Sequence, residues 1–578
     1  METPTEVNQM IFKQYYLGCL SHASYLIGDE ETGEAVVIDP QRDVDEYLLD
    51  AAANGLVIKR VIETHFHADF LSGHLEVASR TGAEIIYGAA ASGRVGFPIK
   101  TYSNGEHIRI GALDLEILET PGHTPESICV VIRPTGPESH PYGVLTGDTL
   151  FIGDVGRPDL LASVGVTAEE LARDLYHSLH EKLMTLPDDT LVFPAHGAGS
   201  ACGKNLSTET VSTIGEQRES NYALAPMVIE DFVDVVTQGQ TPAPLYFAFA
   251  ANKNRESRAL LDQSSTTRAM DLEELLKHQR GGAVVIDARD DLAFAQGHLT
   301  GSINIGLTGR FAEYAGQVMA PGTPIILVTD PGSEDEAKMR LARIGFDHVL
   351  GALTNPLETM VANPELVERL SRLSTHELAE RMKSVNGLVL IDVRNVNEVA
   401  LGSIPGALKV SLSTLLGAVE SLDRSAPTVV FCAGGYRSAI ASSLLRSHGF
   451  SDVSDLIGGY AAWGAANVPA VLPAITVGEV ANKPDSVLLD VREDDEWGAG
   501  HAPKALHIAM QSIAEHVAEL DRDRQIICVC RSGSRSARVT AWLIAEGFDA
   551  INMTGGMQAW EAAGKSVVDQ DGLRGTVI

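Results

Sequence analysis

The sequence contains few cysteines for its length. There are six among 578 residues, far below the density that a disulfide framework needs. Basic residues are also scarce: 44 lysines and arginines stand against 77 aspartates and glutamates, which gives a net charge of −33. So acidic a surface repels nucleic acid and anionic lipid, and it favours a small-molecule substrate or a protein partner. We therefore expect reduced thiols, no nucleic-acid partner and no membrane association.

Long apolar runs are absent too. None approaches the length needed to span a bilayer, and no early segment combines basic residues with an apolar core and a cleavage site. We expect a cytoplasmic protein that assembles as a homo-oligomer. At about 150 residues per domain, a chain of this length corresponds to roughly four domains.

The C-terminal part of the sequence repeats one pattern three times. Each copy has an apolar strand ending in Asp-x-Arg, a polar helix, a Gly-rich turn, a second apolar strand and a helix ending in Gly-Phe. The copies open with "AVVIDARDDL" at residue 283, "LVLIDVRNVN" at 388 and "SVLLDVREDD" at 486. A period near 100 residues is too long for a solenoid unit, so it indicates a duplicated domain. The alternation of strand and helix predicts an α/β fold with a mostly parallel sheet in each copy.

These patterns divide the chain into one N-terminal domain and three tandem copies. The N-terminal region also alternates strands and helices, and it ends in a Pro-rich crossing, "GQTPAPLYFAFAANKNRES". The predicted domains are 1–258, 265–368, 370–472 and 473–572.

The N-terminal region holds an ordered set of metal-ligating side chains. "THFHADF" carries His65, His67 and Asp69, "PGHT" carries His123, and "GD" carries Asp148; "PAHG" adds His196. Most of these motifs follow apolar strands, where an α/β scaffold gathers ligands rigidly. One such residue could be a simple cap or core group, but the ordered set predicts a metal site.

This set of motifs resembles the metallo-β-lactamase superfamily over roughly the first 250 residues, and within it the persulfide dioxygenases. The resemblance implies an αββα sandwich and one Fe(II) per chain held by His65, His123 and Asp148. In that family "GDVGRPDL" lies near the thiol pocket, which makes Arg157 a candidate contact for the substrate's carboxylate. Two imidazoles and one carboxylate form the facial triad of non-haem iron oxygenases, with positions left open for substrate and O₂.

Position 70 departs from the dinuclear members of the superfamily, which read H-x-H-x-D-H. Phe70 stands where the last histidine belongs and donates nothing to a metal. We therefore expect that the second site does not hold a metal. His67, Asp69 and His196 would instead orient ligands or transfer protons. Two alternatives stay open: His74 replaces the missing ligand, or a second site with fewer ligands still fills.

The tandem copies resemble rhodanese domains, the sulfurtransferases, over about 265–572. Cys432 in "CAGGYRS" and Cys530 in "CRSGSRS" each end a strand and open a loop that leads into a helix. The loop amides and the helix N-terminus form an anion-binding nest that stabilises thiolate or persulfide. Arg437 and Arg535 close loops of the form C-x4-R, which suits one sulfur atom rather than a phosphate. We expect both arginines to bind substrate.

The first copy lacks this chemistry. Asp330 stands at the cysteine position, and Phe346 follows it by 16 residues, whereas the equivalent phenylalanine follows the cysteine by 18 in both other copies. We interpret this copy as a non-catalytic spacer or docking domain. Among the remaining cysteines, Cys202 in "GSACGK" is a candidate thiol relay beside the metal, with a structural role as the equal alternative.

Together these resemblances predict a bifunctional sulfide-oxidation enzyme. The first domain would oxidise a low-molecular-weight persulfide such as glutathione persulfide with O₂, giving sulfite and thiol, and the rhodanese copies would move sulfur between persulfide, sulfite and thiosulfate. One alternative is a zinc thioester hydrolase of glyoxalase II type, which Phe70 and the fused copies oppose. The other is a non-catalytic sulfur carrier or scaffold, which the metal set and the two cysteine loops oppose.

Overall fold

The computed structural model describes residues 10–160, 166–204, 206–467, 472–517, 520–522, 524–570 and 572–577. These residues form two compact units. The first contains the chain up to Arg369 with Ser413–Gly417, and the second contains Leu370–Leu412 with Ala418 onward. The N-terminal domain and the first tandem copy lie in the first unit, and the other two copies lie in the second.

Two six-stranded sheets build the N-terminal domain, in the orders β1-β2-β3-β4-β5-β6 and β12-β11-β10-β9-β8-β7. The first sheet consists of β1 (Met10–Leu17), β2 (His22–Asp29), β3 (Glu34–Ile38), β4 (Val57–Ile62), β5 (Glu84–Gly88) and β6 (Lys100–Tyr102). The second consists of β7 (His107–Ile110), β8 (Leu113–Glu119), β9 (Ile128–Arg133), β10 (Gly143–Gly147), β11 (Leu191–Pro194) and β12 (Ser212–Thr213).

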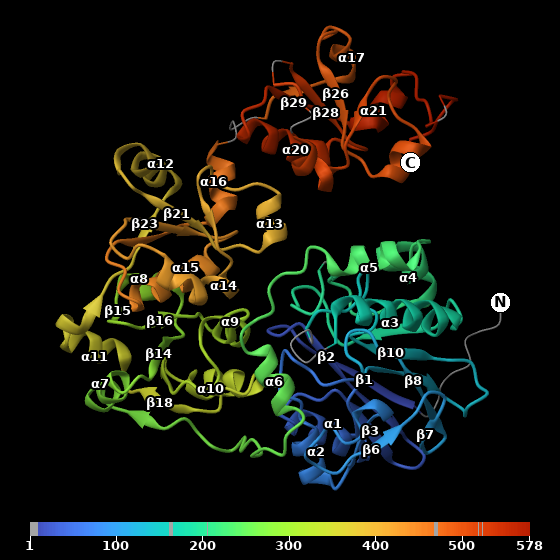
Figure 1. The fold of residues 1–578 in the computed structure, drawn as a ribbon, viewed down its shortest axis with the longest axis vertical. Helices are drawn as coiled ribbons and strands as arrows, with labels where there is room; N and C mark the ends of the chain where they lie inside the picture. The colour runs from blue at the N-terminus through green and yellow to red at the C-terminus, as the bar shows by residue number, and fades with distance from the viewer. Residues whose placement is uncertain are drawn as a thin grey trace. The chain divides into compact units, whose positions relative to one another are not determined.

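Helices cover the outer face of each sheet (Figure 1). They are α1 (Asp45–Ala53), α2 (His74–Thr81), α3 (Ala168–Glu181), α4 (Ile214–Ser220) and α5 (Ile229–Thr237), and α6 (Phe247–Lys253) follows them in the chain. A core rich in isoleucine and valine fills the space between the sheets. A second core joins the first sheet to α1 and α2, and a third joins the other sheet to α3 and α5. The expected αββα sandwich is confirmed.

Each tandem copy has a five-stranded parallel sheet, and all three sheets share one strand order. That order is β13-β18-β17-β14-β16 in the first copy, β20-β24-β23-β21-β22 in the second and β25-β29-β28-β26-β27 in the third. The three α/β domains with parallel sheets are therefore confirmed. The Asp-x-Arg motif ends a central strand in every copy, where the arginine binds the aspartate two residues before it.

The elements of the first copy are β13 (Ala269–Met270), α7 (Leu272–Arg280), β14 (Val284–Asp287), α8 (Asp291–Gln296), β15 (His298–Leu299), β16 (Ile303–Asn304), α9 (Phe311–Val318), β17 (Ile325–Val328), α10 (Glu334–Arg343), β18 (Val349–Leu353), α11 (Pro356–Ala362) and β19 (Val367–Glu368). Those of the second are β20 (Ser371–Leu373), α12 (Thr375–Ser384), β21 (Val389–Asp392), α13 (Val396–Ala400), β22 (Leu408–Lys409), α14 (Leu412–Ala418), β23 (Thr428–Phe431), α15 (Tyr436–Ser447), β24 (Val453–Leu456) and α16 (Gly459–Asn467). Those of the third are β25 (Ala474–Ile475), α17 (Val477–Val480), β26 (Val487–Asp490), α18 (Asp494–Ala499), β27 (Leu506–His507), α19 (Ile513–His516), β28 (Ile526–Val529), α20 (Ser534–Ala545), β29 (Ala550–Met553) and α21 (Gly556–Ala562).

Candidate metal centre and cysteine loops

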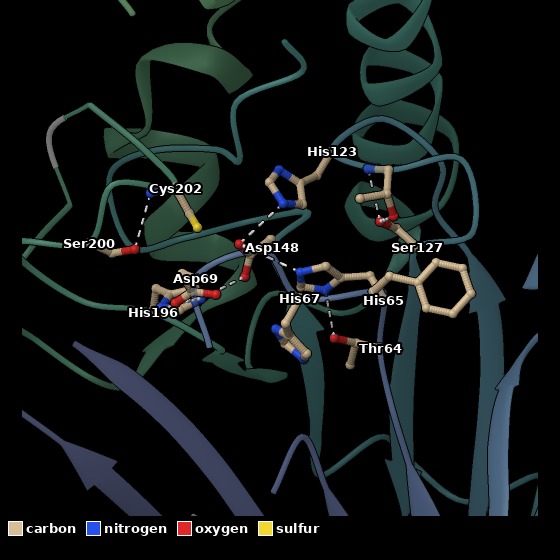
Figure 2. Close-up of polar contacts among 12 residues, drawn as sticks. Thr64, His65, His67, Asp69, His123, Ser127, Asp148, His196, Ser200 and Cys202 are labelled. Carbon is tan, nitrogen blue, oxygen red and sulfur yellow. Dashed lines mark hydrogen bonds and ion pairs between the residues drawn. The ribbon is translucent and has the colours of Figure 1, made fainter. Parts of the chain in front are cut away.

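Three strand ends of the N-terminal domain converge on one buried cluster. His65 follows β4, His123 follows β8 and Asp148 follows β10, and one ligand atom of each lies within 4.8 Å of the others. Nε2 of His123 lies 3.5 Å from Oδ2 of Asp148, and Nε2 of His65 lies 3.9 Å from the same oxygen. Figure 2 shows these side chains pointing toward one another. The structure thus brings together the three residues expected to hold iron.

Hydrogen bonds fix which nitrogen of each imidazole faces the cluster. Nδ1 of His123 lies 2.8 Å from the Arg157 carbonyl, which can only accept, so Nδ1 carries the proton and Nε2 keeps its lone pair. Nδ1 of His65 lies 3.0 Å from Oγ1 of Thr64, whose own proton goes to Asp39 at 2.8 Å. Outer partners of this kind orient metal-binding histidines.

Two glycines permit this packing. Gly147 has a left-handed φ of +50°, and a Cβ there would lie 2.6 Å from Oγ1 of Thr64. A Cβ on Gly156 would lie 1.9 Å from the Asp148 carbonyl and 3.1 Å from Nδ1 of His123. Any larger residue at either position would displace a ligand-bearing loop.

His67, Asp69 and His196 form a second cluster with ligand atoms within 4.8 Å of one another. Asp148 faces both clusters, because its Oδ1 lies 3.5 Å from Nε2 of His196 while its Oδ2 faces the first. Both oxygens of Asp69 and Asp148, and Nε2 of His196, are buried without a hydrogen-bond partner in the described part of the chain. Buried oxygens and nitrogens left unpaired in this way fit a bound cation.

The ring of Phe70 fills the space beside the second cluster. Its centroid lies 4.5 Å from that of His67 and 4.0 Å from that of His22. His74, the candidate replacement, lies instead at the start of α2 with Nδ1 3.3 Å from Glu63. His74 belongs to none of the ligand clusters found in the described residues, so the structure does not support this alternative.

Sequence reasoning missed His22. Its side chain is fully buried, its ring centroid lies 5.5 Å from that of His196, and both ring nitrogens lack a hydrogen-bond partner in the described part of the chain. No motif surrounds His22 in the sequence, so only the pairing of β2 beside the loop of His196 reveals it.

Burial sets the direction of the pKa shift for most groups in the cluster. It raises the pKa of Asp148 to about 6 against the opposing effect of His196, and it raises the pKa of Asp69 to about 6 against that of His67. Burial likewise lowers the pKa of His123 to about 4. For His67, burial lowers the pKa, but the charge and hydrogen bond of Asp39 outweigh it and raise the pKa to about 9.

Arg157 is buried and its guanidinium is already engaged. It binds both oxygens of Asp159 at 2.6 and 2.7 Å, and it donates to the carbonyls of Ala201 and Thr241. A substrate carboxylate would have to displace Asp159. The geometry therefore indicates that Arg157 positions a metal ligand, because its backbone carbonyl orients His123.

Cys202 lies beside the cluster (Figure 2). Its sulfur is within 4.8 Å of ligand atoms of Asp148 and His196. Burial, reinforced by Asp69 and Asp148, raises the pKa of this thiol well above its ordinary value. Because the thiolate is the reactive form, this position disfavours reaction of the free thiol and leaves its relay role a prediction.

Cys432 and Cys530 occupy equivalent loops between a central strand and a long helix. The Gly435 amide donates to Sγ of Cys432 at 3.1 Å, and the Gly533 amide donates to Sγ of Cys530 at 3.2 Å. Burial raises the pKa of Cys530, but hydrogen bonds from Ser536 and loop amides outweigh it and bring the pKa below its ordinary value. The loop thus has the anion-binding character that the sequence predicts.

The arginines that close these loops are paired with glutamates. Arg437 binds both carboxylate oxygens of Glu398, and Arg535 binds both of Glu496. These side chains, expected to bind substrate, are therefore partly neutralised. The backbone amides remain the most direct source of positive potential at each sulfur.

The first copy has a cavity of about 320 Å³ beside the position of the missing cysteine. Asp290, Asp330, Ser333, Glu336 and Arg340 are among its lining residues. The Gly332 amide, in the loop after Asp330, donates to Glu334 rather than pointing at a sulfur. This copy has no cysteine at the site.

None of the helices in the described ranges is long and apolar enough to cross a membrane. This agrees with the absence of long apolar runs in the sequence.

Comparison with known proteins identifies both parts of the chain. The family model of the metallo-beta-lactamase superfamily matches residues 17–196, and that of the rhodanese-like domain matches 271–353, 374–466 and 476–563. The human protein named mitochondrial persulfide dioxygenase ETHE1 is 33% identical over 235 residues, which cover 40% of this chain and 82% of that protein.

Two further relatives match the chain over different lengths. A hydroxyacylglutathione hydrolase of Polaromonas is 35% identical over 189 residues, covering 32% of this chain and 66% of the hydrolase. The crystal structure of a metallo-beta-lactamase from Staphylococcus aureus superposes with a TM-score of 0.55 at 34% identity, covering 60% of this chain and all of that one. The chain thus belongs to the metallo-beta-lactamase superfamily and carries three rhodanese-like domains after its metallo-beta-lactamase domain.

Proposed function

We propose that the N-terminal domain oxidises a low-molecular-weight persulfide with O₂. The reaction is RSSH + O₂ + H₂O → RSH + HSO₃⁻ + H⁺, in which the outer sulfur is oxidised, O₂ is reduced and the thiol is released. Glutathione persulfide is the substrate we favour. The observation that carries the proposal is the cluster of His65, His123 and Asp148, in which both imidazoles present Nε2.

The donor set fits Fe(II). Two neutral imidazoles and one carboxylate are the donor set of non-haem Fe(II) oxygenases, which also bind their substrates at the metal. When bound, iron would supply the O₂ chemistry that no side chain can provide. The protein's part is to hold the ligands rigidly, through Thr64 and the Arg157 carbonyl, and to bury the reacting sulfur away from bulk water.

We further propose one iron per chain, in the first cluster. Phe70 occupies the place of the fourth ligand of the second cluster and packs its ring against His67. His67, Asp69 and His196 would then surround and orient the ligands. Asp148, which faces both clusters, is the group through which they would act on the iron site.

The second and third copies would carry sulfur on cysteine. With thiosulfate as donor the step is Cys–S⁻ + S₂O₃²⁻ → Cys–S–S⁻ + SO₃²⁻, so one S–S bond breaks as another forms. The amides of Gly435 and Gly533 already point at the sulfurs of Cys432 and Cys530, where the anionic charge lies. Sulfite from the first domain is the acceptor that would return this sulfur as thiosulfate.

Metal analysis combined with an oxygen electrode tests the proposal. The protein should contain about one iron per chain and consume O₂ only with persulfide. His65→Ala should reduce O₂ uptake by more than about 100-fold, because a lost ligand costs more than the 10- to 100-fold typical of an outer partner. His140→Ala, at an exposed histidine paired with Asp189, is the matched control and should change nothing.

A second candidate is a thioester hydrolase, which the Polaromonas relative favours. Zinc or two metals per chain, with cleavage of S-lactoylglutathione and no persulfide-dependent O₂ uptake, would establish that activity. Sulfur transfer by Cys432 and Cys530 should survive His65→Ala in either case, because those residues lie in other domains.

A further inference from the structure

The first tandem copy packs directly against the loop that carries Asp69 and Phe70. The Leu71 amide donates to the Arg343 carbonyl at the end of α10, at 2.7 Å. The hydroxyl of Tyr246 donates to the Asp69 carbonyl at 2.9 Å, and its ring lies against α9, where a Cβ on Gly316 would come within 2.2 Å of it. All eight residues of α9 are buried.

Ion pairs fix this copy in place. Arg343 binds both oxygens of Asp43 at 2.9 and 2.5 Å, and Arg42 binds Asp347 at 2.5 Å. Both pairs join the N-terminal domain to α10 and the turn after it. The copy without the cysteine is therefore held directly against the loop that carries Asp69 and Phe70.

Arg310 stands at the start of α9, beside the loop that links His196 to Cys202. A Cβ on Gly199, in the middle of that loop, would lie 3.7 Å from Nη1 of Arg310 and 3.8 Å from its Cζ. The side chain keeps 29% of its surface exposed. The guanidinium therefore lies against the loop that carries His196 and Cys202, and part of its side chain is accessible to solvent.

The guanidinium is only partly engaged. Nη2 pairs with Glu313, one turn later on α9, while Nε is buried without a hydrogen-bond partner among the residues described. Arg157, in contrast, donates four hydrogen bonds, two to the Asp159 carboxylate and two to backbone carbonyls. In a chain with a net charge of −33, an anionic substrate needs a local cation of this kind.

We propose that Arg310 binds a carboxylate of the thiol part of the persulfide, so that the first tandem copy completes the substrate site of the metal centre. This inference rests on the proposed persulfide oxidation. Its recognition chemistry is a charge-assisted, fork-shaped contact between guanidinium and carboxylate, for which Glu313 competes. A copy that contributes a substrate-binding residue to the neighbouring domain needs no cysteine of its own.

Two substitutions should act in opposite directions. Arg310→Ala should raise the KM for glutathione persulfide about tenfold or more, since hydrogen bonds to charged groups carry that much affinity. Glu313→Gln should lower it, because the competing carboxylate is gone. A purely structural ion pair would instead make both variants less stable and leave both KM values unchanged. Arg268→Ala, at an exposed arginine of the same copy paired with Glu274, is the control and should leave KM unchanged.

The substrate itself gives a second control. The persulfide of 2-mercaptoethanol has no carboxylate, so Arg310→Ala should leave its KM unchanged. Calorimetry with S-methylglutathione, which cannot be oxidised by this route, should show affinity falling about tenfold in Arg310→Ala at unchanged iron content. Equal KM values for glutathione persulfide in wild type and Arg310→Ala, with O₂ uptake intact, would overturn the inference alone. Absence of O₂ uptake with any persulfide would overturn the proposed function instead.

Discussion

The guanidinium of Arg535 binds both carboxylate oxygens of Glu496, at 2.6 and 2.7 Å. Arg437 and Glu398 repeat this pair at the same distances in the other cysteine-bearing copy. Both glutamates stand six residues after the aspartate of Asp-x-Arg, where the first copy has Ala293. The first copy thus lacks both the cysteine and the glutamate, which links the arginine–glutamate ion pair to the cysteine loop.

The pair predicts competition between Glu496 and an anionic substrate for Arg535. In a Cys432→Ser background, Glu496→Gln should lower the KM for thiosulfate at least about twofold, because the neutral amide binds a guanidinium more weakly than a carboxylate does. Steady-state assays with cyanide as acceptor measure this. An unchanged or higher KM at equal thermal stability would contradict it.

Thr64 links His65 to Asp39, so its hydroxyl should control metal affinity. Thr64→Val keeps the shape but removes the acceptor for Nδ1 of His65, and iron affinity should fall about 10- to 100-fold. Competition with a chelator gives the value. Thr64→Ser, which restores a hydroxyl, should recover most of it; equal loss in both variants would point to packing rather than hydrogen bonding.

Asp330→Cys should not create a third sulfur site. Its loop is two residues shorter than the active ones, and Glu334, Asp335 and Glu336 follow it at the start of α10. These carboxylates would raise a thiol's pKa and repel sulfite or thiosulfate. The substitution is made in a variant lacking Cys432 and Cys530, and persulfide on the new thiol in mass spectra would refute the prediction.

Cys530 should be the better site for thiosulfate and sulfite. Its loop carries Arg531 as well as Arg535, whereas the Cys432 loop carries only Arg437. Two cations favour a small dianion more than one does. Cys530→Ser should therefore remove most thiosulfate turnover and Cys432→Ser should spare it. Similar losses in both variants would mean that the backbone amides supply most of the field, and the reverse pattern would contradict the argument from side-chain charge.

The pH dependence of sulfur transfer should follow Ser536. Burial raises the pKa of Cys530, but the hydrogen bond from the Ser536 hydroxyl helps to bring it below its ordinary value. Since the thiolate reacts, the rate rises with pH through this pKa. Ser536→Ala should raise the pKa and move the limb of the pH–rate profile to higher pH, measured in a Cys432→Ser background. A limb that stays in place would show that the loop amides alone hold the thiolate.

The sequence by itself determined the layers, the threefold repeat, the candidate ligands and the cysteine loops. These features depend on short-range patterns: apolar strands that end in a fixed motif, and residues whose spacing fits one kind of loop. His65, His123 and Asp148 each end or follow a strand, so their meeting at one edge follows from the fold class. The absence of cysteine at Asp330 could likewise be read from a single position.

The tertiary structure decided which charges remain available. Arg157, Arg437 and Arg535 all suggest anion binding in the sequence, yet each meets a carboxylate in the fold. Pairings such as Arg437 with Glu398 span 39 residues, and the approach of Arg310 to Gly199 spans more than one hundred. Local patterns carry no information about such contacts, because tertiary packing, within a domain or between two domains, sets them. The fold therefore decided which carboxylate each of these arginines meets, while the sequence determined only that the arginines are present.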